Sequence, residues 1–211
     1  FKDKPFQVLK NAIDSQNFIA DADTRNEIRK ELVLKDKFVV GHVGRLHPQK
    51  NHDFLIDVFA EIKKEKPDAE LILVGTGPLE EKVKSKVVEK GLSDCVHFLG
   101  NRKDMNRIYQ AMDVFVFPSL TEGFSNAMLE AMAHGLPIIA TDVGAATDMI
   151  ENCGGTVVSI HDVSAMQSAL NNMNKPETRK AMSEWNINKV KQCYEYNQVI
   201  EKLFHVYEEA I

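Results

Sequence analysis

The chain has 211 residues, of which 44% are hydrophobic and 27% are charged, and its formal net charge is -5. This length and composition are sufficient for one sizeable core, so we expect one main globular domain. The negative charge argues against a nucleic-acid binder that relies on a basic surface. No apolar run approaches the roughly 20 residues that span a bilayer, and the first ten residues lack the apolar core of a signal peptide.

Three cysteines, Cys95, Cys153 and Cys193, lie far apart and form no CxxC motif. An odd number of widely spaced cysteines is typical of free thiols in a reducing compartment, so we expect a cytoplasmic protein. The chain begins at Phe1 rather than at a methionine, and we expect it to be a piece of a longer protein.

Strand and helix signals alternate along the chain. A helix is expected over 24–34, and short apolar runs predict strands at 37–46, 69–77, 95–100, 113–119, 136–142 and 154–159. Helices with apolar residues at helical spacing are predicted between the strands, at 51–67, 78–91, 104–112 and 125–135. This alternation predicts an α/β fold, a Rossmann-like doubly wound parallel sheet of six strands with flanking helices.

The two ends of the chain depart from that alternation. We interpret residues 1–23 as an extended linker, residues 24–192 as the α/β domain and residues 193–211 as a C-terminal helix. The chain is predicted to be helical from about residue 162 onwards.

Two basic residues follow the first predicted strand, in the segment GRLHPQKN. Ligands of open α/β sheets bind at the carboxyl ends of the strands, which is where Arg45 and Lys50 lie. Arginine binds a diphosphate with a bidentate fork and lysine binds it as a point charge. The segment is not a P-loop, because GxxxxGK[ST] is absent, and two such residues by themselves also fit a solvated loop.

The next strand ends in a glycine-rich turn, VGTGPLEE. Gly75 and Gly77 suggest a dinucleotide fingerprint, but Glu80 stands where that fingerprint requires glycine. We therefore interpret the segment as a tight strand-to-helix turn.

The stretch TEGFSNAMLEA, at 121–131, carries two glutamates with seven residues between them. The free N–H groups at the start of the predicted helix favour an anion. Glu122, in the turn, can accept hydrogen bonds from sugar hydroxyls. Glu130 lies roughly 7–8 Å farther along the helix axis, in an apolar sequence where a buried carboxylate needs a partner. The spacing suits a ligand with hydroxyls on both sides of a phosphate, whereas a helix-end charge and a solvated glutamate are the simpler alternatives.

These segments, together with VHFLGNRKDMNRIYQAMDVFVFPS and HGLPIIATDVG, resemble the C-terminal, donor-binding domain of retaining glycosyltransferases with the GT-B fold. The similarity is to the group 1, or family 4, type that builds bacterial exopolysaccharide, capsule and related glycans. It extends over about residues 11–210, and its most specific element is the glutamate pair in register with Arg45 and Lys50.

The resemblance implies a site in which Arg45, Lys50 and Glu122 are the catalytic residues. The two basic residues bind the donor diphosphate and Glu122 holds the donor sugar, while Glu130 binds the ribose. The other donor-binding positions implied are Gly44, Asn101, Arg102, Gly123, Phe124, Ser125, Asn126 and Ala127. Asn101 and Arg102 would flank the base. Ser125 replaces a common glycine and Asp148 replaces a common glutamate, so the sugar stays open.

The resemblance also implies the partners. The donor would be a nucleoside diphosphate sugar, with UDP favoured over GDP, and no cofactor or metal is expected. A glycan or lipid-linked acceptor would be held by an N-terminal domain that this chain lacks, and residues 193–211 would cross back to that domain. The full-length protein would be cytoplasmic, with peripheral association at the inner face of the membrane as an option, and this half by itself would be inactive. A GT-B sugar-nucleotide epimerase or hydrolase and a non-catalytic nucleotide-binding module are the alternatives.

Overall fold

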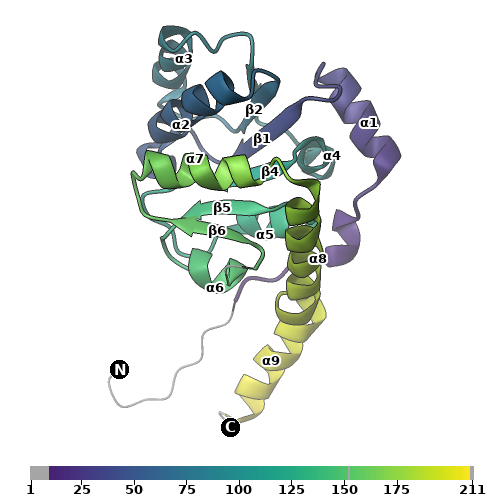
Figure 1. The fold of residues 1–211 in the computed structure, drawn as a ribbon. Helices are drawn as coiled ribbons and strands as arrows, with labels where there is room; N and C mark the ends of the chain where they lie inside the picture. The colour runs from purple at the N-terminus through teal and green to yellow at the C-terminus, as the bar shows by residue number, and fades with distance from the viewer. Residues whose placement is uncertain (1–9, 152, 210–211) are drawn as a thin grey trace.

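A computed structural model describes residues 10–151 and 153–209 of the chain. Its centre is a six-stranded sheet with the order β3-β2-β1-β4-β5-β6, and every pairing is parallel (Figure 1). The strands are β1 (Phe38–Val43), β2 (Ala69–Val74), β3 (Val96–Gly100), β4 (Val114–Phe117), β5 (Ile138–Thr141) and β6 (Gly155–Val158). The predicted doubly wound fold is confirmed, and the strand order reverses between β1 and β4, which is where such folds bind ligands.

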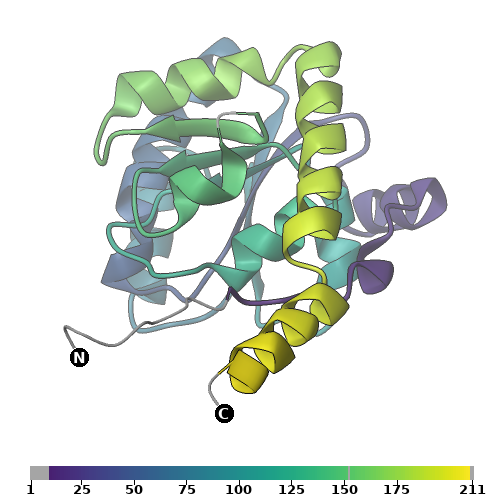
Figure 2. The same cartoon turned by 90° about the horizontal axis from the view of Figure 1, so that it is seen from below.

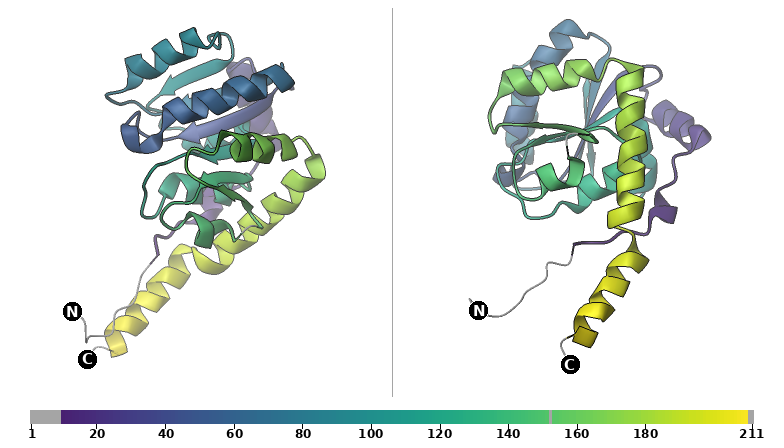
Figure 3. Two further views of the ribbon diagram at one scale, coloured as in Figure 1. Left: turned by 60° about the vertical axis from the view of Figure 1, so that its left-hand side comes forward. Right: turned by 60° about the horizontal axis from the view of Figure 1, so that its bottom comes forward.

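Helices cover both faces of the sheet (Figure 3). One core cluster holds side chains of α2, α3 and α7, and the other holds side chains of α1, α4, α5, α6 and α8. Neighbouring strand residues alternate between the clusters, so that Val39 lies in one and Val40 in the other, as the twofold period of a strand requires. The helices are α1 (Ala22–Glu31), α2 (His52–Glu65), α3 (Glu80–Glu89), α4 (Met105–Ala111), α5 (Asn126–Ala133), α6 (Ala146–Ile150), α7 (Val163–Asn172), α8 (Pro176–Cys193) and α9 (Tyr196–Glu209).

The C-terminal helix α9 leaves the body of the domain (Figures 1 and 2). Phe204 and Tyr207 on this helix are 64% and 63% exposed. The predicted boundary at residue 193 coincides with the last residue of α8, so the predicted separate helix begins three residues later than expected.

Two local predictions need correction. The part of the predicted linker that the structure describes, 10–23, is only partly extended, because it contains the 3₁₀ helix Ser15–Phe18 and the start of α1; residues 1–9 lie outside the described part. Ile13 also pairs with the end of α8, donating to Tyr194 O at 2.8 Å. The short helix α6 was not predicted, because five residues are too few to show a helical period.

Candidate functional site

The carboxyl ends of β1 and β2 are joined by backbone packing. Gly44 N–H donates to Val74 O at 2.9 Å, and Leu46 N–H donates to Thr76 O at 3.1 Å. A Cβ at Gly75 would lie 2.2 Å from Gly44 O, and Gly75 has a φ of +125°, which favours glycine. The structure therefore agrees with the interpretation of VGTGPLEE as a tight turn, and this turn supports the loop that carries Arg45.

Lys50 and Glu122 meet across the point where the strand order reverses. Lys50 ends the 3₁₀ helix Pro48–Lys50 after β1, and Glu122 follows β4. Leu120 N–H donates to Gln49 O at 2.8 Å, which ties the two loops together, and Lys50 Nζ contacts Glu122 Oε2. The two side chains are 20% and 25% exposed. The structure thus brings together two predicted residues whose direct ion pair was not anticipated.

Arg45 is exposed at the same edge, and it makes no hydrogen bond or ion pair with any residue that the structure describes. An unpaired guanidinium keeps all five of its donors available for an incoming group. Arg45 and the paired Lys50 therefore differ in how readily each can accept an anion.

Two buried histidines, His42 and His52, lie close enough to Lys50 for its charge to affect their pKa values. His42 is fully buried, and its Nδ1 lies 2.9 Å from Val116 O, which fixes this nitrogen as the donor. The pKa of His42 is lowered to about 3, first by burial and then by the charges of His52 and Lys50. Burial likewise lowers the pKa of His52 to about 4. Near neutral pH, both imidazoles are therefore uncharged.

The start of α5 faces the same edge. Ser125 is buried, and its hydroxyl caps the helix by accepting from Met128 N–H at 3.3 Å. Asn126 Oδ1 accepts a hydrogen bond from Asn11 Nδ2 at 2.7 Å. Helix geometry leaves the amides of Asn126 and Ala127 without intrahelical acceptors, so they are available to a ligand. The Ser125 side chain serves the helix, which makes it a capping residue rather than a surface group.

The loop after β5 supports the backbone of Glu122 and Gly123. Ala145 N–H donates to Gly123 O at 2.9 Å. A Cβ at Gly144 would lie 2.2 Å from Glu122 O and 2.4 Å from Gly123 O, and Gly144 has a φ of +55°. The Phe124 ring packs edge-on against Tyr194 at the end of α8, with a centroid distance of 5.7 Å. The position of Glu122 therefore depends mainly on backbone contacts.

Glu130 has the partner that its apolar surroundings require. The Tyr109 hydroxyl, from α4, donates to Glu130 Oε2 at 2.8 Å. Burial raises the pKa of Glu130, and the hydrogen bond from Tyr109 lowers it. Sequence reasoning missed Tyr109, because nothing local in either helix indicates that the two side chains meet.

The turn after β3 differs from the expectation for its two residues. Arg102 donates to both oxygens of Asp104 at 2.7 Å and to Glu31 at 3.2 Å, and these partners raise its pKa. Its guanidinium is thus held by α1 and by the residue before α4, whereas Asn101 is exposed. Of the two predicted base-flanking residues, Asn101 has the freer side chain.

Within 10–151 and 153–209, no group of three or more His, Cys, Asp or Glu side chains is arranged to hold a metal ion. In the same residues, no helix is both long enough and apolar enough to cross a membrane.

The sequence matches the model of a known protein family, described as glycosyl transferases group 1, over residues 37–175. The lipopolysaccharide core biosynthesis mannosyltransferase LpsB of Rhizobium meliloti is 35% identical over 178 residues, which are 80% of this chain and 50% of that protein. The UDP-Gal:alpha-D-GlcNAc-diphosphoundecaprenol alpha-1,3-galactosyltransferase of Escherichia coli is 29% identical over 206 residues, which are 95% of this chain and 53% of that protein.

A solved structure shares the fold. Anabaena HepE in complex with UDP superposes with a TM-score of 0.91 at 23% identity, over 96% of this chain and 57% of that one. This chain therefore spans about half the length of these three proteins. With its GT-B-type sheet and a family match over more than half of its residues, the chain belongs to the group 1 glycosyl transferases.

Proposed function

We propose that this chain is the donor-binding half of a retaining glycosyltransferase. The whole enzyme would transfer a sugar from a nucleoside diphosphate sugar to a glycan or lipid-linked acceptor in surface polysaccharide synthesis. The contact between Lys50 and Glu122 carries the proposal, because it joins the loops of β1 and β4 at the reversal point, beside the start of α5.

The diphosphate would be the leaving group, and its departure is the step that needs stabilisation. Arg45, Lys50 and the amides of Asn126 and Ala127 supply positive charge and donors at one edge of the sheet. Groups already positioned where negative charge develops lower the barrier. When the donor binds, Lys50 would exchange Glu122 for a phosphate oxygen, and the released Glu122 would accept hydrogen bonds from the sugar. These groups would suffice without a metal ion.

Glu130 would bind the ribose. Tyr109 holds Oε2, which leaves the other carboxylate oxygen and the remaining lone pairs as acceptors for two neighbouring hydroxyls. Glu130 lies on the same helix as the phosphate-binding amides, one turn or more along, so one rigid element would position both parts of the nucleotide.

The base is proposed to be uracil. The Escherichia coli relative is named for UDP-Gal, and the HepE structure contains UDP. GDP-mannose is the second donor to test, because a Mycolicibacterium smegmatis relative that is 31% identical over 175 residues is named as GDP-mannose-dependent.

Helix α9 would dock on an acceptor-binding domain. Its apolar side includes Phe204 and Tyr207, both more than half exposed. An exposed apolar face of this kind usually marks a surface that another domain covers. Closure of the two domains on the donor would also exclude water from the reaction.

Calorimetry on this chain with UDP, GDP and ADP tests the donor site. We expect UDP to bind, and we expect Lys50→Ala and Glu130→Ala each to weaken binding by about tenfold, because each removes a charge-assisted hydrogen bond. The matched controls are Lys180→Ala and Glu27→Ala, which remove the same charges from exposed positions and should leave the affinity unchanged. Absence of binding to every nucleotide contradicts the proposal.

The reaction class is tested with the full-length protein and a sugar nucleotide. Transfer with retention requires an acceptor and yields a product with the anomeric configuration of the donor, which NMR coupling constants report. Turnover without acceptor would instead indicate the epimerase or the hydrolase.

A further inference from the structure

A cavity of about 340 Å³ lies at the opposite edge of the sheet from the donor site. Its walls include Phe38, Asp68 and Asp113, which stand at or next to the amino ends of β1, β2 and β4. Its volume falls within the range of small-ligand pockets, about 300–1,000 Å³. Three of its lining residues are acidic and six are basic, namely Arg25, Arg29, Lys35, Lys37, Lys66 and Arg179.

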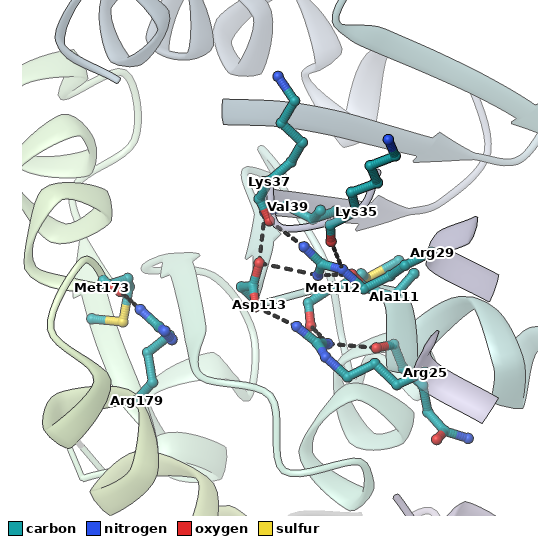
Figure 4. Close-up of polar contacts among 11 residues, drawn as sticks. Arg25, Arg29, Lys35, Lys37, Val39, Ala111, Met112, Asp113, Met173 and Arg179 are labelled. Carbon is teal, nitrogen blue, oxygen red and sulfur yellow. Dashed lines mark hydrogen bonds and ion pairs between the residues drawn. The ribbon is translucent and has the colours of Figure 1, made fainter. Parts of the chain in front are cut away.

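Two of the basic residues are committed to the fold. Figure 4 shows Arg25 and Arg29, both from α1, reaching the carboxylate of Asp113. Arg29 is buried and donates to the carbonyl oxygens of Lys35 at 2.7 Å and Ala111 at 2.8 Å. Asp113 also accepts from Val39 N–H at 2.7 Å. This network fixes α1 to β1 and to the residue before β4, and it neutralises the carboxylate of Asp113.

The other four basic residues lack a hydrogen-bonded carboxylate among the residues that the structure describes. Lys66 Nζ lies 3.7 Å from Asp68, and Lys37 Nζ lies 3.8 Å from Glu70, both beyond hydrogen-bond distance. Lys35 and Arg179 form no ion pair within 10–151 and 153–209. In Figure 4 the Lys35 and Lys37 side chains extend away from Asp113, so they do not neutralise it.

The ring of Phe38 makes cation–π contacts with two of these cations. Lys66 Nζ lies 5.0 Å from the centroid of its ring, and the Arg179 guanidinium carbon lies 5.9 Å from the same centroid. Arg179, which Figure 4 shows approaching from α8, also donates to the carbonyl oxygen of Met173. An aromatic ring and a backbone carbonyl attract a cation without cancelling its charge, so two positive charges stay concentrated over one ring.

By contrast, lysines of α3 and the lysine directly after it are paired with acids. Lys82 Nζ lies 2.5 Å from Asp53, and Lys86 and Lys90 lie 2.6 Å and 2.9 Å from Asp57. The other four cations of this cavity thus lack a hydrogen-bonded carboxylate in the described part of the chain, whereas these lysines are neutralised by acids of α2.

We propose that this cavity binds a compact anion of the phosphate class. Arg179 offers a planar fork for two oxygens, and Lys35, Lys37 and Lys66, which line the same cavity, offer point charges. The anion would relieve the repulsion among these cations. The phosphate could belong to a free anion or to a lipid headgroup, and both present the same chemistry. The site is independent of the proposed donor site, which lies at the carboxyl edge.

The test is a titration of the ¹⁵N-labelled chain with inorganic pyrophosphate at constant ionic strength, followed by amide NMR. Arg45→Gln serves as the background, because it weakens binding at the donor site. We expect saturable shifts at 35–38 and 173–179. In Arg179→Gln the dissociation constant should rise about tenfold, since one charge-assisted fork is lost. Lys180→Gln is the matched control, because it removes the neighbouring charge on α8 from a side chain that is 78% exposed.

Lys35→Gln separates binding from folding, because the structure gives Lys35 Nζ no described partner; it should weaken pyrophosphate while the melting temperature stays unchanged. Flotation with vesicles of phosphatidylcholine, with and without phosphatidic acid, distinguishes the sources. Vesicle binding that Arg179→Gln abolishes and pyrophosphate competes for would assign the site to a headgroup, whereas pyrophosphate binding without flotation would assign it to a free anion. If neither probe binds, or if Lys180→Gln matches Arg179→Gln, the proposal is wrong.

Discussion

The two edges of the sheet hold charge in different ways. At the carboxyl edge, loops after β1, β2, β4 and β5 pack through their backbones, and Lys50 is neutralised by Glu122 while Arg45 stays unpaired. At the amino edge, side chains do the positioning, because buried Arg29 connects three carbonyl groups and Asp113. Arg179 and three lysines that lack a hydrogen-bonded carboxylate among the described residues line the cavity beside that network.

This difference has a consequence for mutational tests. The carboxyl edge, which backbone contacts hold in place, should be disturbed by adding atoms at its glycines. The amino edge, which side chains hold in place, should be disturbed by removing a guanidinium. The surface charges of both edges can then be removed with little change in stability. Stability and ligand binding can therefore be separated at each edge.

Arg29→Ala should have the largest effect on folding. It leaves three carbonyl oxygens without their donor and weakens the neutralisation of Asp113. Removing one member of a buried, hydrogen-bonded charge network costs about 3–5 kcal/mol. Urea denaturation measures the loss, and Lys30→Ala, at the exposed neighbouring position, should change the free energy of unfolding by less than about 0.5 kcal/mol. Equal stabilities would show that the amino edge is not held by Arg29.

Gly144→Ala should disturb the carboxyl edge. The new Cβ would meet Glu122 O and Gly123 O, and φ is +55°, so left-handed strain and overpacking together should cost about 2–4 kcal/mol. Gly91→Ala is the matched control, since its φ is +68° and nothing lies within 4 Å of its Cβ position. That variant should lose only about 1–2 kcal/mol. The difference between the two isolates the contact with the Glu122 backbone, and equal losses would refute it.

The sequence predicted the sheet better than the site. Six short apolar runs with helical segments between them are sufficient for a parallel sheet, and each run became a strand. Several strands were predicted too long at their ends. The apolar run at 37–46, for example, continues beyond Val43, where β1 ends, into the following loop. The capping function of Ser125 had a signal, a serine just before an apolar helix.

Other features carry no such signal. Tyr109 and Glu130 lie on different helices, and only the packing of α4 beside α5 brings them together. Arg25 and Arg29 look like the polar side of a surface helix, and nothing local indicates that Asp113 will meet them. Both cases depend on tertiary placement, which periodicity does not encode.

The two edges should also differ in acid, because the carboxyl edge holds His42 and His52, whose pKa values are lowered by burial. The pKa of His52 is about 4 in the folded chain and 6.5 as an ordinary value. The unfolded chain therefore takes up this proton first. Stability from neutral His52 is complete above pH 6.5 and is lost as the pH falls towards about 4. At pH 5 the loss is about 2 kcal/mol.

His52→Phe should remove that part of the pH dependence. The structure gives its ring nitrogens no hydrogen bond, so phenylalanine keeps the aromatic packing on His42 without leaving a broken bond. Unfolding free energies at pH 7 and pH 5 should differ by about 2 kcal/mol less in the variant than in the parent. His161→Asn, at an exposed left-handed position, should leave the difference unchanged. An unaltered slope in His52→Phe would mean that His52 is not buried and neutral.

Tyr109→Phe should have the smallest effect of these variants, a change in UDP affinity. It tests whether the site at the carboxyl edge extends along α5 to Glu130. The variant keeps the ring and removes the donor to Glu130. Glu130 would be less well oriented, and because the Tyr109 hydrogen bond lowers its pKa, loss of that bond raises the pKa further. We expect UDP affinity to fall by about 1 kcal/mol, roughly fivefold. The loss should grow as the pH falls, because a protonated Glu130 is a weaker acceptor. Tyr207→Phe, an exposed tyrosine on α9, controls for the missing hydroxyl. A purely structural Tyr109 would lower the melting temperature without this pH-dependent loss of affinity, and the ribose-binding role of Glu130 would then lose its support.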